Sequence, residues 1–135
     1  MWTTILRGGH FDYMDDNLHF RAKPASEKRA ALHRQISYLA AFVQPLKLWE
    51  VQPDDAPVKA GYAFAIASTN GLATYLPHGG VVTLDLAKLT GALRARRFNP
   101  RSGSFIEPFG VDDGRAREFK ALDENDRVLL LKRWP

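Results

Sequence analysis

The spacing of apolar residues changes near residue 45, from one helical turn to every second position. Before this point, apolar side chains recur three or four residues apart and form a single stripe: Leu32, Ile36, Leu39 and Val43. This spacing predicts one amphipathic helix from Ser26, a suitable N-cap, to Gln44. Pro45 is expected to end it, because proline cannot continue a helix.

After Pro45, apolar and polar positions alternate in short runs separated by turns rich in Gly, Pro, Asn and Asp. Residues 48–51 predict a short strand, and Asn70-Gly71 predicts a hairpin with a type I′ turn. Three runs within residues 81–109 predict a meander of consecutive strands. The continuous apolar run at 128–131 predicts a central strand covered on both faces. The expected fold is mainly β: an antiparallel β-sandwich of about eight strands, preceded by one amphipathic α-helix.

Composition narrows the function classes. The 135 residues suffice for a proper core, and 19 Lys and Arg against 15 Asp and Glu give a net charge of +4. This excess is smaller than that of a dedicated nucleic-acid binder, which argues against nucleic acid as a partner. No apolar run approaches a membrane span, and residues 1–7 are too short for a signal peptide. We therefore expect a soluble protein without membrane contact; its compartment stays open.

Catalytic and metal-binding motifs are missing from the sequence. There is no cysteine, nucleophile elbow, phosphate loop or HExxH, and the four histidines are scattered, so we expect no catalytic residue, cofactor or metal. Asp12, Asp15 and Asp16 lie among aromatic residues, and two carboxylates are what a glycosidase uses. A remnant glycosidase using these three is an alternative. A solvated loop explains them more simply, and we expect no enzyme.

A cluster of arginines is the candidate ligand-binding site. Its members lie on and just after one predicted strand: Arg94, Arg96, Arg97 and Arg101. Strand alternation places Arg94 and Arg96 on one face and Arg97 on the other. Such a patch can hold an anionic polysaccharide, and an independent binding protein for an anionic polymer is an alternative function. The simpler interpretation is an edge strand kept soluble by its charges.

Several motifs in the second half of the chain occur in one family. They are V-x-L-D-L-x-x-L-x-G at 82–91, F-N-P-R-S-G at 98–103, Y-x-P-x-G at 75–79 and the last strand from Asp126. Over roughly residues 46–132 the chain resembles the C-terminal β-sandwich called the putative collagen-binding domain of a collagenase. Arg96-Arg97 and Arg127 depart from this pattern, because the family commonly carries aromatic residues there.

The resemblance implies a context as well as a fold. Family members usually follow an apiosidase-type, glycoside-hydrolase-like barrel in secreted bacterial proteins, and the first forty-odd residues here look like the last segment of such a barrel. We therefore expect two parts, residues 1–45 (N-terminal segment and helix) and residues 46–135 (β-sandwich). The implied function is a non-catalytic accessory module that contacts carbohydrate, with the catalytic carboxylates lying upstream.

The N-terminal segment carries an apolar group that resembles part of an absent barrel: Trp2, Ile5, Leu6, Phe11, Tyr13 and Phe20. Leaving several such side chains in water favours association strongly. The segment can fold back on its own sandwich or pair with a second copy. We expect a homodimer with residues 1–20 in the interface, because a two-fold axis is the commoner solution for a self-complementary patch. A glycoside-hydrolase-like barrel is the alternative partner.

Overall fold

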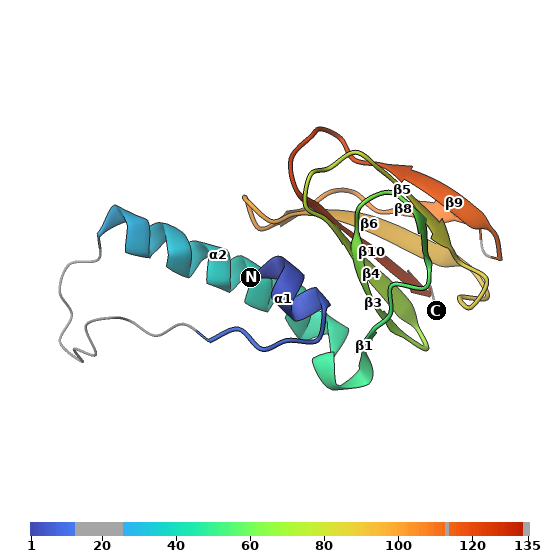
Figure 1. The fold of residues 1–135 in the computed structure, drawn as a ribbon, viewed down its shortest axis with the longest axis horizontal. Helices are drawn as coiled ribbons and strands as arrows, with labels where there is room; N and C mark the ends of the chain where they lie inside the picture. The colour runs from blue at the N-terminus through green and yellow to red at the C-terminus, as the bar shows by residue number, and fades with distance from the viewer. Residues whose placement is uncertain (13–25, 113, 134–135) are drawn as a thin grey trace.

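The computed structural model describes residues 1–12, 26–112 and 114–133 (Figure 1). The helical elements are α1 (Trp2–Leu6), α2 (Glu27–Val43) and the 3-10 turns η1 (Gln44–Leu46) and η2 (Leu48–Glu50). The strands are β1 (Gln52–Pro53), β2 (Val58–Ala60), β3 (Phe64–Ser68), β4 (Gly71–Leu76), β5 (Val81–Asp85), β6 (Leu93–Asn99), β7 (Ser104–Phe105), β8 (Phe109–Val111), β9 (Ala116–Lys120) and β10 (Arg127–Arg133). They form two antiparallel sheets, so the predicted fold class is confirmed.

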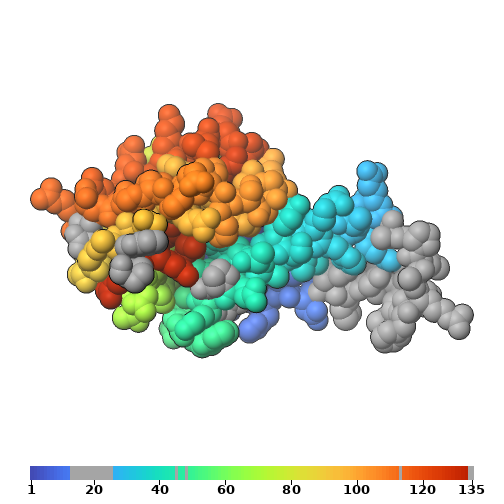
Figure 2. Space-filling view, turned by 180° about the vertical axis from the view of Figure 1, so that it is seen from behind, coloured from blue at the N-terminus to red at the C-terminus, as the bar shows by residue number. Residues whose placement is uncertain are grey.

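The predicted helix is confirmed as α2. The Ser26 Oγ accepts a hydrogen bond from the Arg29 backbone N–H at 3.3 Å, which caps the first turn. The C-terminal half of α2 packs on the strands, and Leu39 and Phe42 are buried there. The N-terminal half extends away from the sheets (Figures 1 and 2).

The larger sheet has the order β1-β3-β4-β10-β6-β7, with β8 also paired to β6. Its centre is β10, the apolar run predicted to be covered on both faces, and that prediction is confirmed. Leu129 and Leu131 enter one core, whereas Val128 and Leu130 enter another. A strand buried on both sides needs no polar alternation, which explains its sequence.

The smaller sheet, β2-β5-β9, covers one face of the larger sheet. We call the residues between the two sheets the inter-sheet core; its buried members are Ala65, Leu72, Leu76, Val82, Leu84, Leu86, Leu89, Leu93, Ala95, Phe119, Leu129 and Leu131. These residues recur at every second position of β5 and β6, which is the alternation that predicts the strands.

The opposite face of the larger sheet is covered by the helices. We call this second set the helix-side core; its buried members are Trp2, Leu6, Leu39, Phe42, Leu46, Ile66, Ala73, Tyr75, Phe98, Val128 and Leu130. Rings meet at its centre, with Trp2 and Phe98 centroids 5.5 Å apart and Phe42 and Phe98 centroids 5.1 Å apart. The molecule therefore has three layers: small sheet, large sheet and helices.

The position of α2 depends on a close contact with the β6–β7 turn. Gly103 has a φ of +69°, and a Cβ on it would lie 2.2 Å from the Tyr38 ring. Gln35 Nε2 also donates to the backbone carbonyl of Arg101 at 3.5 Å. The glycine is thus required by its backbone conformation and by the helix that packs against it.

The predicted meander over residues 81–109 is wrong. β5 belongs to the small sheet, and β6 pairs with β10 in the large sheet. The link between them contains Leu86 and Leu89, which are buried at 0% and 6% exposure. Burying these side chains carries the chain across the inter-sheet core instead of into a tight turn. The third predicted run is also split, into β7 and β8, on either side of Pro108.

Two local predictions are corrected. Residues 48–51 form η2 followed by an extended Val51 instead of a strand, because the Glu50 N–H donates to the Lys47 carbonyl at 2.7 Å. The β3–β4 hairpin exists, yet Asn70 and Gly71 do not have the positive φ of a type I′ turn. Gly71 is needed for space: a Cβ there would lie 2.7 Å from the Leu131 carbonyl oxygen.

Candidate functional site

The arginines of β6 divide between the two faces of the large sheet. Leu93 and Ala95 enter the inter-sheet core, so Arg94 and Arg96 project on the helix side and both are exposed. The Arg96 guanidinium lies 4.2 Å from the centroid of the Phe105 ring. Arg97 projects on the other side and lies 4.6 Å from the Phe109 ring centroid. These stacking contacts hold Arg96 and Arg97 against the sheet edge.

Arg101 has a different environment from the other three arginines. Its Nε lies 2.7 Å from Oδ1 of Asp126, whose side chain is only 16% exposed. The Tyr75 hydroxyl donates to the other oxygen of Asp126 at 3.3 Å. Arg101 therefore joins the β6–β7 turn to the start of β10, while its own side chain is 60% exposed.

Tyr75 gives this contact a measurable pH dependence. Burial, followed by the nearby Asp126 carboxylate, raises the pKa of Tyr75 to about 12. In the unfolded chain the phenol ionises near pH 10, so between about pH 10 and 12 the folded state retains a proton that the unfolded state has lost. We expect stability to fall as pH rises through this window. Denaturation midpoints of the wild type and Tyr75→Phe at pH 9, 10 and 11 check this, and equal pH slopes would contradict it.

Arg127, at which the sequence resemblance implies an aromatic residue, is buried at 8% exposure. Its guanidinium donates to an Asp123 carboxylate oxygen and to the Asp126 carbonyl. A side-chain hydrogen bond from Asn125 holds the pKa of Asp123 below its usual value, with Arg127 a smaller cause. The Arg127 charge is therefore paired with a carboxylate of the β9–β10 loop.

The apolar group of the N-terminal segment is partly covered by the chain itself. Trp2 and Leu6 are buried in the helix-side core, and Ile5 packs against it. Phe11 is 37% exposed, whereas Tyr13 and Phe20 lie outside the described residues. Trp2 and Leu6 are therefore not available as an exposed dimer surface in this fold. The homodimer itself stays a prediction. The division into residues 1–45 and 46–135 also stays a prediction, and side chains of both parts meet in the helix-side core.

Of the three candidate carboxylates, the structure describes one. Asp12 is exposed, and Asp15 and Asp16 lie outside the described residues. Within the described part of the chain, no three His, Cys, Asp or Glu side chains are grouped closely enough to hold a metal ion. No helix in that part is long and apolar enough to cross a membrane.

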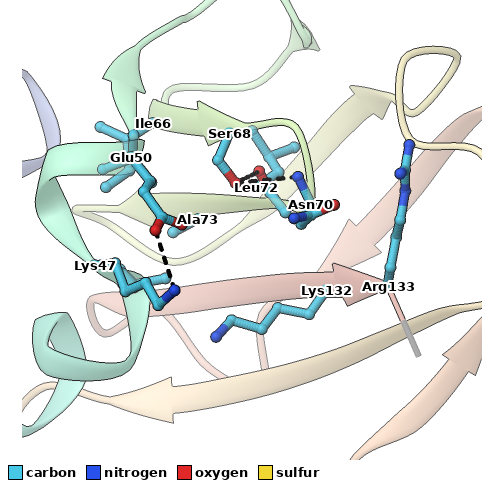
Figure 3. A pocket seen from close by; sticks show the side chains of 12 residues that line it. Lys47, Glu50, Ile66, Ser68, Asn70, Leu72, Ala73, Lys132 and Arg133 are labelled. Atoms are coloured by element: carbon cyan, nitrogen blue, oxygen red, sulfur yellow. Dashed lines mark hydrogen bonds and ion pairs between the residues drawn. The ribbon is translucent and has the colours of Figure 1, made fainter. Parts of the chain in front are cut away.

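A polar pocket that the sequence analysis missed opens where the β3–β4 hairpin meets η1 and η2 (Figure 3). Its volume is about 210 Å³. It is lined by Leu46, Lys47, Glu50, Val51, Ile66, Ser68, Asn70, Gly71, Leu72, Ala73, Lys132 and Arg133. We call it the η-pocket. Buried Ile66 and Ala73 contribute apolar surface to it, and the polar side chains come from three separate parts of the chain.

Backbone geometry builds one wall of the η-pocket. Lys47, between η1 and η2, has a φ of 50° and is the one non-glycine residue with positive φ among the described residues. This left-handed conformation is costly for a side-chain-bearing residue. It lets both Lys47 and Glu50 line the pocket, where Lys47 Nζ lies 3.0 Å from Glu50 Oε1. Figure 3 shows the Lys132 side chain extending from β10 toward this wall.

Strand register connects the η-pocket with the predicted arginine cluster. Arg94 on β6 lies directly opposite Lys132 on β10. Both project on the helix side, because their neighbours Ala95 and Leu131 enter the inter-sheet core. The sequence gives a weak indication of a cationic site here, since Lys132 and Arg133 follow the apolar run at 128–131. Only the pairing of β6 with β10 shows that Arg94 belongs beside them.

Two exposed aromatic side chains precede strands of the large sheet: Trp49 lies before β1, and Tyr62 lies before β3. Trp49, in η2 next to the pocket residue Glu50, is 81% exposed. Tyr62 is 63% exposed and stacks on His78 with ring centroids 5.7 Å apart. Phe64 meets Tyr62 edge-on at 5.3 Å. Tyr and Trp are enriched at binding interfaces, because each combines a large apolar ring with one polar group.

Residues 53–132 match the model of a family described as the putative collagen-binding domain of a collagenase. This range is more than half of the chain. The chain belongs to this family. The resemblance carried by the motifs at 75–79, 82–91 and 98–103 is thereby confirmed. A search of curated proteins finds no match.

Two solved structures share the fold of this family member with a TM-score of 0.66 each. One is titled a glycoside hydrolase and is 23% identical; the other is a glycoside hydrolase family 5 from Bacteroides vulgatus ATCC 8482 and is 24% identical. Each match covers 76% of this chain and 25% of the other. The chain therefore spans a quarter of their length. Because 76% is more than residues 53–132 contain, the shared fold extends beyond the family match.

Proposed function

We propose that this chain is a non-catalytic accessory module of a carbohydrate-active protein and that it contacts carbohydrate directly. Membership of a binding-domain family supports the accessory role. The shared fold with one quarter of two glycoside hydrolases supports the association with carbohydrate-active enzymes. The partner that we propose is a glycoside-hydrolase-like barrel, and the extended N-terminal half of α2 is the surface that it would cover.

The observation that carries carbohydrate contact is the exposed Trp49, which precedes the η-pocket residue Glu50 in η2. A sugar ring has apolar C–H faces and a rim of hydroxyls, so it binds where an exposed aromatic ring adjoins polar groups. Trp49 presents the ring, and Glu50, the next residue in η2, lines the η-pocket together with the polar residues Ser68 and Asn70. Carbohydrate is expected to lie across η2 and the tip of the β3–β4 hairpin.

Affinity electrophoresis of the isolated chain through gels containing single polysaccharides tests the proposal. We expect retardation by at least one polysaccharide, and Trp49→Ala should weaken it roughly 3- to 10-fold, since an aromatic contact contributes about 0.5–1.5 kcal/mol. Leu122→Ala is the matched control, because Leu122 is also exposed, at 61%, in the β9–β10 loop. The same preparation should not hydrolyse aryl glycosides.

Two outcomes would contradict the proposal. One is the absence of retardation across plant, fungal and bacterial polysaccharides, together with binding to collagen peptides. The other is turnover of aryl glycosides that disappears in Asp12→Asn, which would favour the remnant glycosidase. If Trp49→Ala binds polysaccharide as strongly as the wild type, the accessory role still stands, but the carbohydrate contact does not involve η2.

A further inference from the structure

The small sheet ends in an edge strand, β9, whose free side pairs with no strand of the described residues (Figure 1). β9 pairs with β5 over five residues without a break in register. The other edges are shorter or irregular: β1 and β7 have two residues, β8 has three, and β2 shifts its register between Val58 and Ala60. Short or bulged edges discourage pairing with another chain, and β9 has neither protection.

The hydrogen-bond ladder determines which backbone groups of β9 lie on its free side. The Leu86 N–H donates to the Arg115 carbonyl at 3.3 Å, so the backbone of Arg115 faces β5. In an antiparallel ladder such residues recur at every second position, and residues 117, 119 and 121 face β5 as well. The N–H and C=O groups on the free side are those of Ala116, Glu118 and Lys120.

The charged side chains of β9 leave its free side open. Phe119 is buried in the inter-sheet core, so alternation places the Glu118 and Lys120 side chains on the opposite, solvent-exposed face of the small sheet. They cover that face and not the direction in which a further strand would form hydrogen bonds. Charge at these positions keeps the sheet soluble without closing its edge.

A groove of about 220 Å³ lies between β9 and β8, and we call it the β8–β9 groove. Phe109 and Val111 project into it from β8. They lie opposite Ala95 and Leu93 of β6, which places both on the inter-sheet face of the large sheet. Both are only partly buried against the inter-sheet core. A strand added to β9 would continue the small sheet and cover these two apolar side chains.

One cation of the β8–β9 groove has no carboxylate partner among the described residues. The Arg97 guanidinium lies 4.6 Å from the Phe109 ring centroid and forms no ion pair in that part of the chain. Arg117, by contrast, lies 2.7 Å from Asp112. Stacking on a ring leaves the fork of N–H donors of Arg97 able to hold a carboxylate with two hydrogen bonds. The groove therefore combines apolar side chains with one position that favours an acid.

We propose that the β9 edge binds an extended peptide segment of another protein, which adds a strand to the small sheet and directs an acidic side chain to Arg97. The backbone of the segment forms the hydrogen bonds, as in other cases of strand addition. Its side chains alternate, so every second one faces the groove. An apolar side chain covers Phe109 and Val111, and an Asp or Glu two residues away meets Arg97. This interaction goes beyond the proposed carbohydrate contact.

A second copy of this chain is a less suitable occupant of the edge. Two copies of β9 paired about a two-fold axis would form one continuous sheet. The side chains that the second copy directs to the groove would then be Arg117 and Phe119, since these face the inter-sheet side in the first copy. The second β9 thus brings a cation to Arg97 and no carboxylate. Charge complementarity favours an acidic segment from a different protein.

Fluorescence anisotropy of the full chain with labelled seven-residue peptides tests the acidic preference. One peptide has threonine at the odd positions, isoleucine at the second and sixth, and glutamate at the centre; its partner has glutamine at the centre. We expect the acidic peptide to bind at least tenfold more tightly, because a hydrogen bond between charged groups is lost in the partner. Arg97→Gln should remove this difference. Arg96→Gln is the matched control, since Arg96 also stacks on a ring, that of Phe105 at 4.2 Å, but on the helix side.

Glu118→Pro tests the backbone pairing. It removes an N–H from the free side of β9 and leaves the ladder with β5 complete, which is the position that an edge strand tolerates for proline. Glu118→Ala keeps this N–H and is the control. We expect Glu118→Pro to bind the acidic peptide at least tenfold more weakly than Glu118→Ala. Thermal melting shows whether both are folded. On the wild type, acidic peptides methylated at the odd or at the even backbone nitrogens give the same information, because only one set faces β9 and only that peptide should lose binding.

Four results would overturn the proposal: no binding of the acidic peptide to the wild type, equal binding of the acidic and glutamine peptides, undiminished binding in Glu118→Pro, or loss of the acidic preference in Arg96→Gln instead of Arg97→Gln. Sedimentation of a wild-type dimer that dissociates in Glu118→Pro would also overturn it, since a second copy would then occupy the edge. Retardation by polysaccharide should be unchanged in Glu118→Pro and Arg97→Gln. A failure of this proposal is therefore distinguishable from a failure of the proposed carbohydrate contact.

Discussion

Replacing Trp2 with alanine is expected to destabilise the fold by about 3–5 kcal/mol, the usual cost of removing a large aromatic side chain from a core. Trp2 is 5% exposed, and its ring lies 5.3 Å from Phe42, 6.1 Å from Tyr75 and 5.5 Å from Phe98, measured between centroids. Its indole N–H has no hydrogen-bond partner among the described residues, so the loss is one of packing. The unfolding midpoint in urea measures it.

Trp49→Ala is the matched control for this prediction. Trp49 is the same residue type at 81% exposure, so its removal should change the free energy of unfolding by no more than about 0.5 kcal/mol. A Trp2→Ala loss as small as that of Trp49→Ala would show that α1 is not part of the core in solution. The apolar side chains of α1 would then be exposed, as the predicted homodimer interface over residues 1–20 requires.

Gly79→Ala is expected to destabilise by about 3 kcal/mol or more. Gly79 has a φ of +61°, and a Cβ on it would lie 2.3 Å from the Asp123 carbonyl oxygen and 2.8 Å from that of Asn125. The left-handed backbone costs an alanine about 1–2 kcal/mol, and displacing the β9–β10 loop adds a similar amount or more. The final glycine of the Y-x-P-x-G motif is therefore required by a neighbouring backbone.

Gly80→Ala separates the two causes. Gly80 also has a positive φ, +78°, yet a Cβ there would meet nothing within 4 Å. It should cost only the conformational part, about 1–2 kcal/mol. The difference between the two variants in urea denaturation then measures the contact with the β9–β10 loop. Equal losses would contradict the close approach of that loop to Gly79.

Sequence patterns predict the elements whose determinants are local. α2 follows from an N-cap at Ser26, an apolar stripe and Pro45. β10 follows from its unbroken apolar run. The predicted type I′ turn is wrong. Gly71 is required instead by the close approach of β10, which is a contact between residues distant in sequence. Leu86 and Leu89 likewise resemble the end of a strand and a turn, although their burial makes them a crossing between sheets.

The site is less predictable than the fold for the same reason. Alternation along β6 correctly separates Arg94 and Arg96 from Arg97. It cannot show that Arg101 contacts Asp126 or that Lys132 lies opposite Arg94, since both depend on the position of β10. Lys47 is harder still, because nothing in its residue type indicates the left-handed backbone that places it in the η-pocket.

The most direct test of the account is a titration of the ¹⁵N-labelled chain with an oligosaccharide of the polysaccharide that retards it most in the gels, followed by NMR. Carbohydrate contact at the η-pocket predicts that the largest amide shifts fall on Lys47, Asn70, Gly71 and Lys132, with a smaller response at Lys88 across the hairpin. Shifts that are absent at saturating saccharide, or that gather around Arg97 instead, would contradict it.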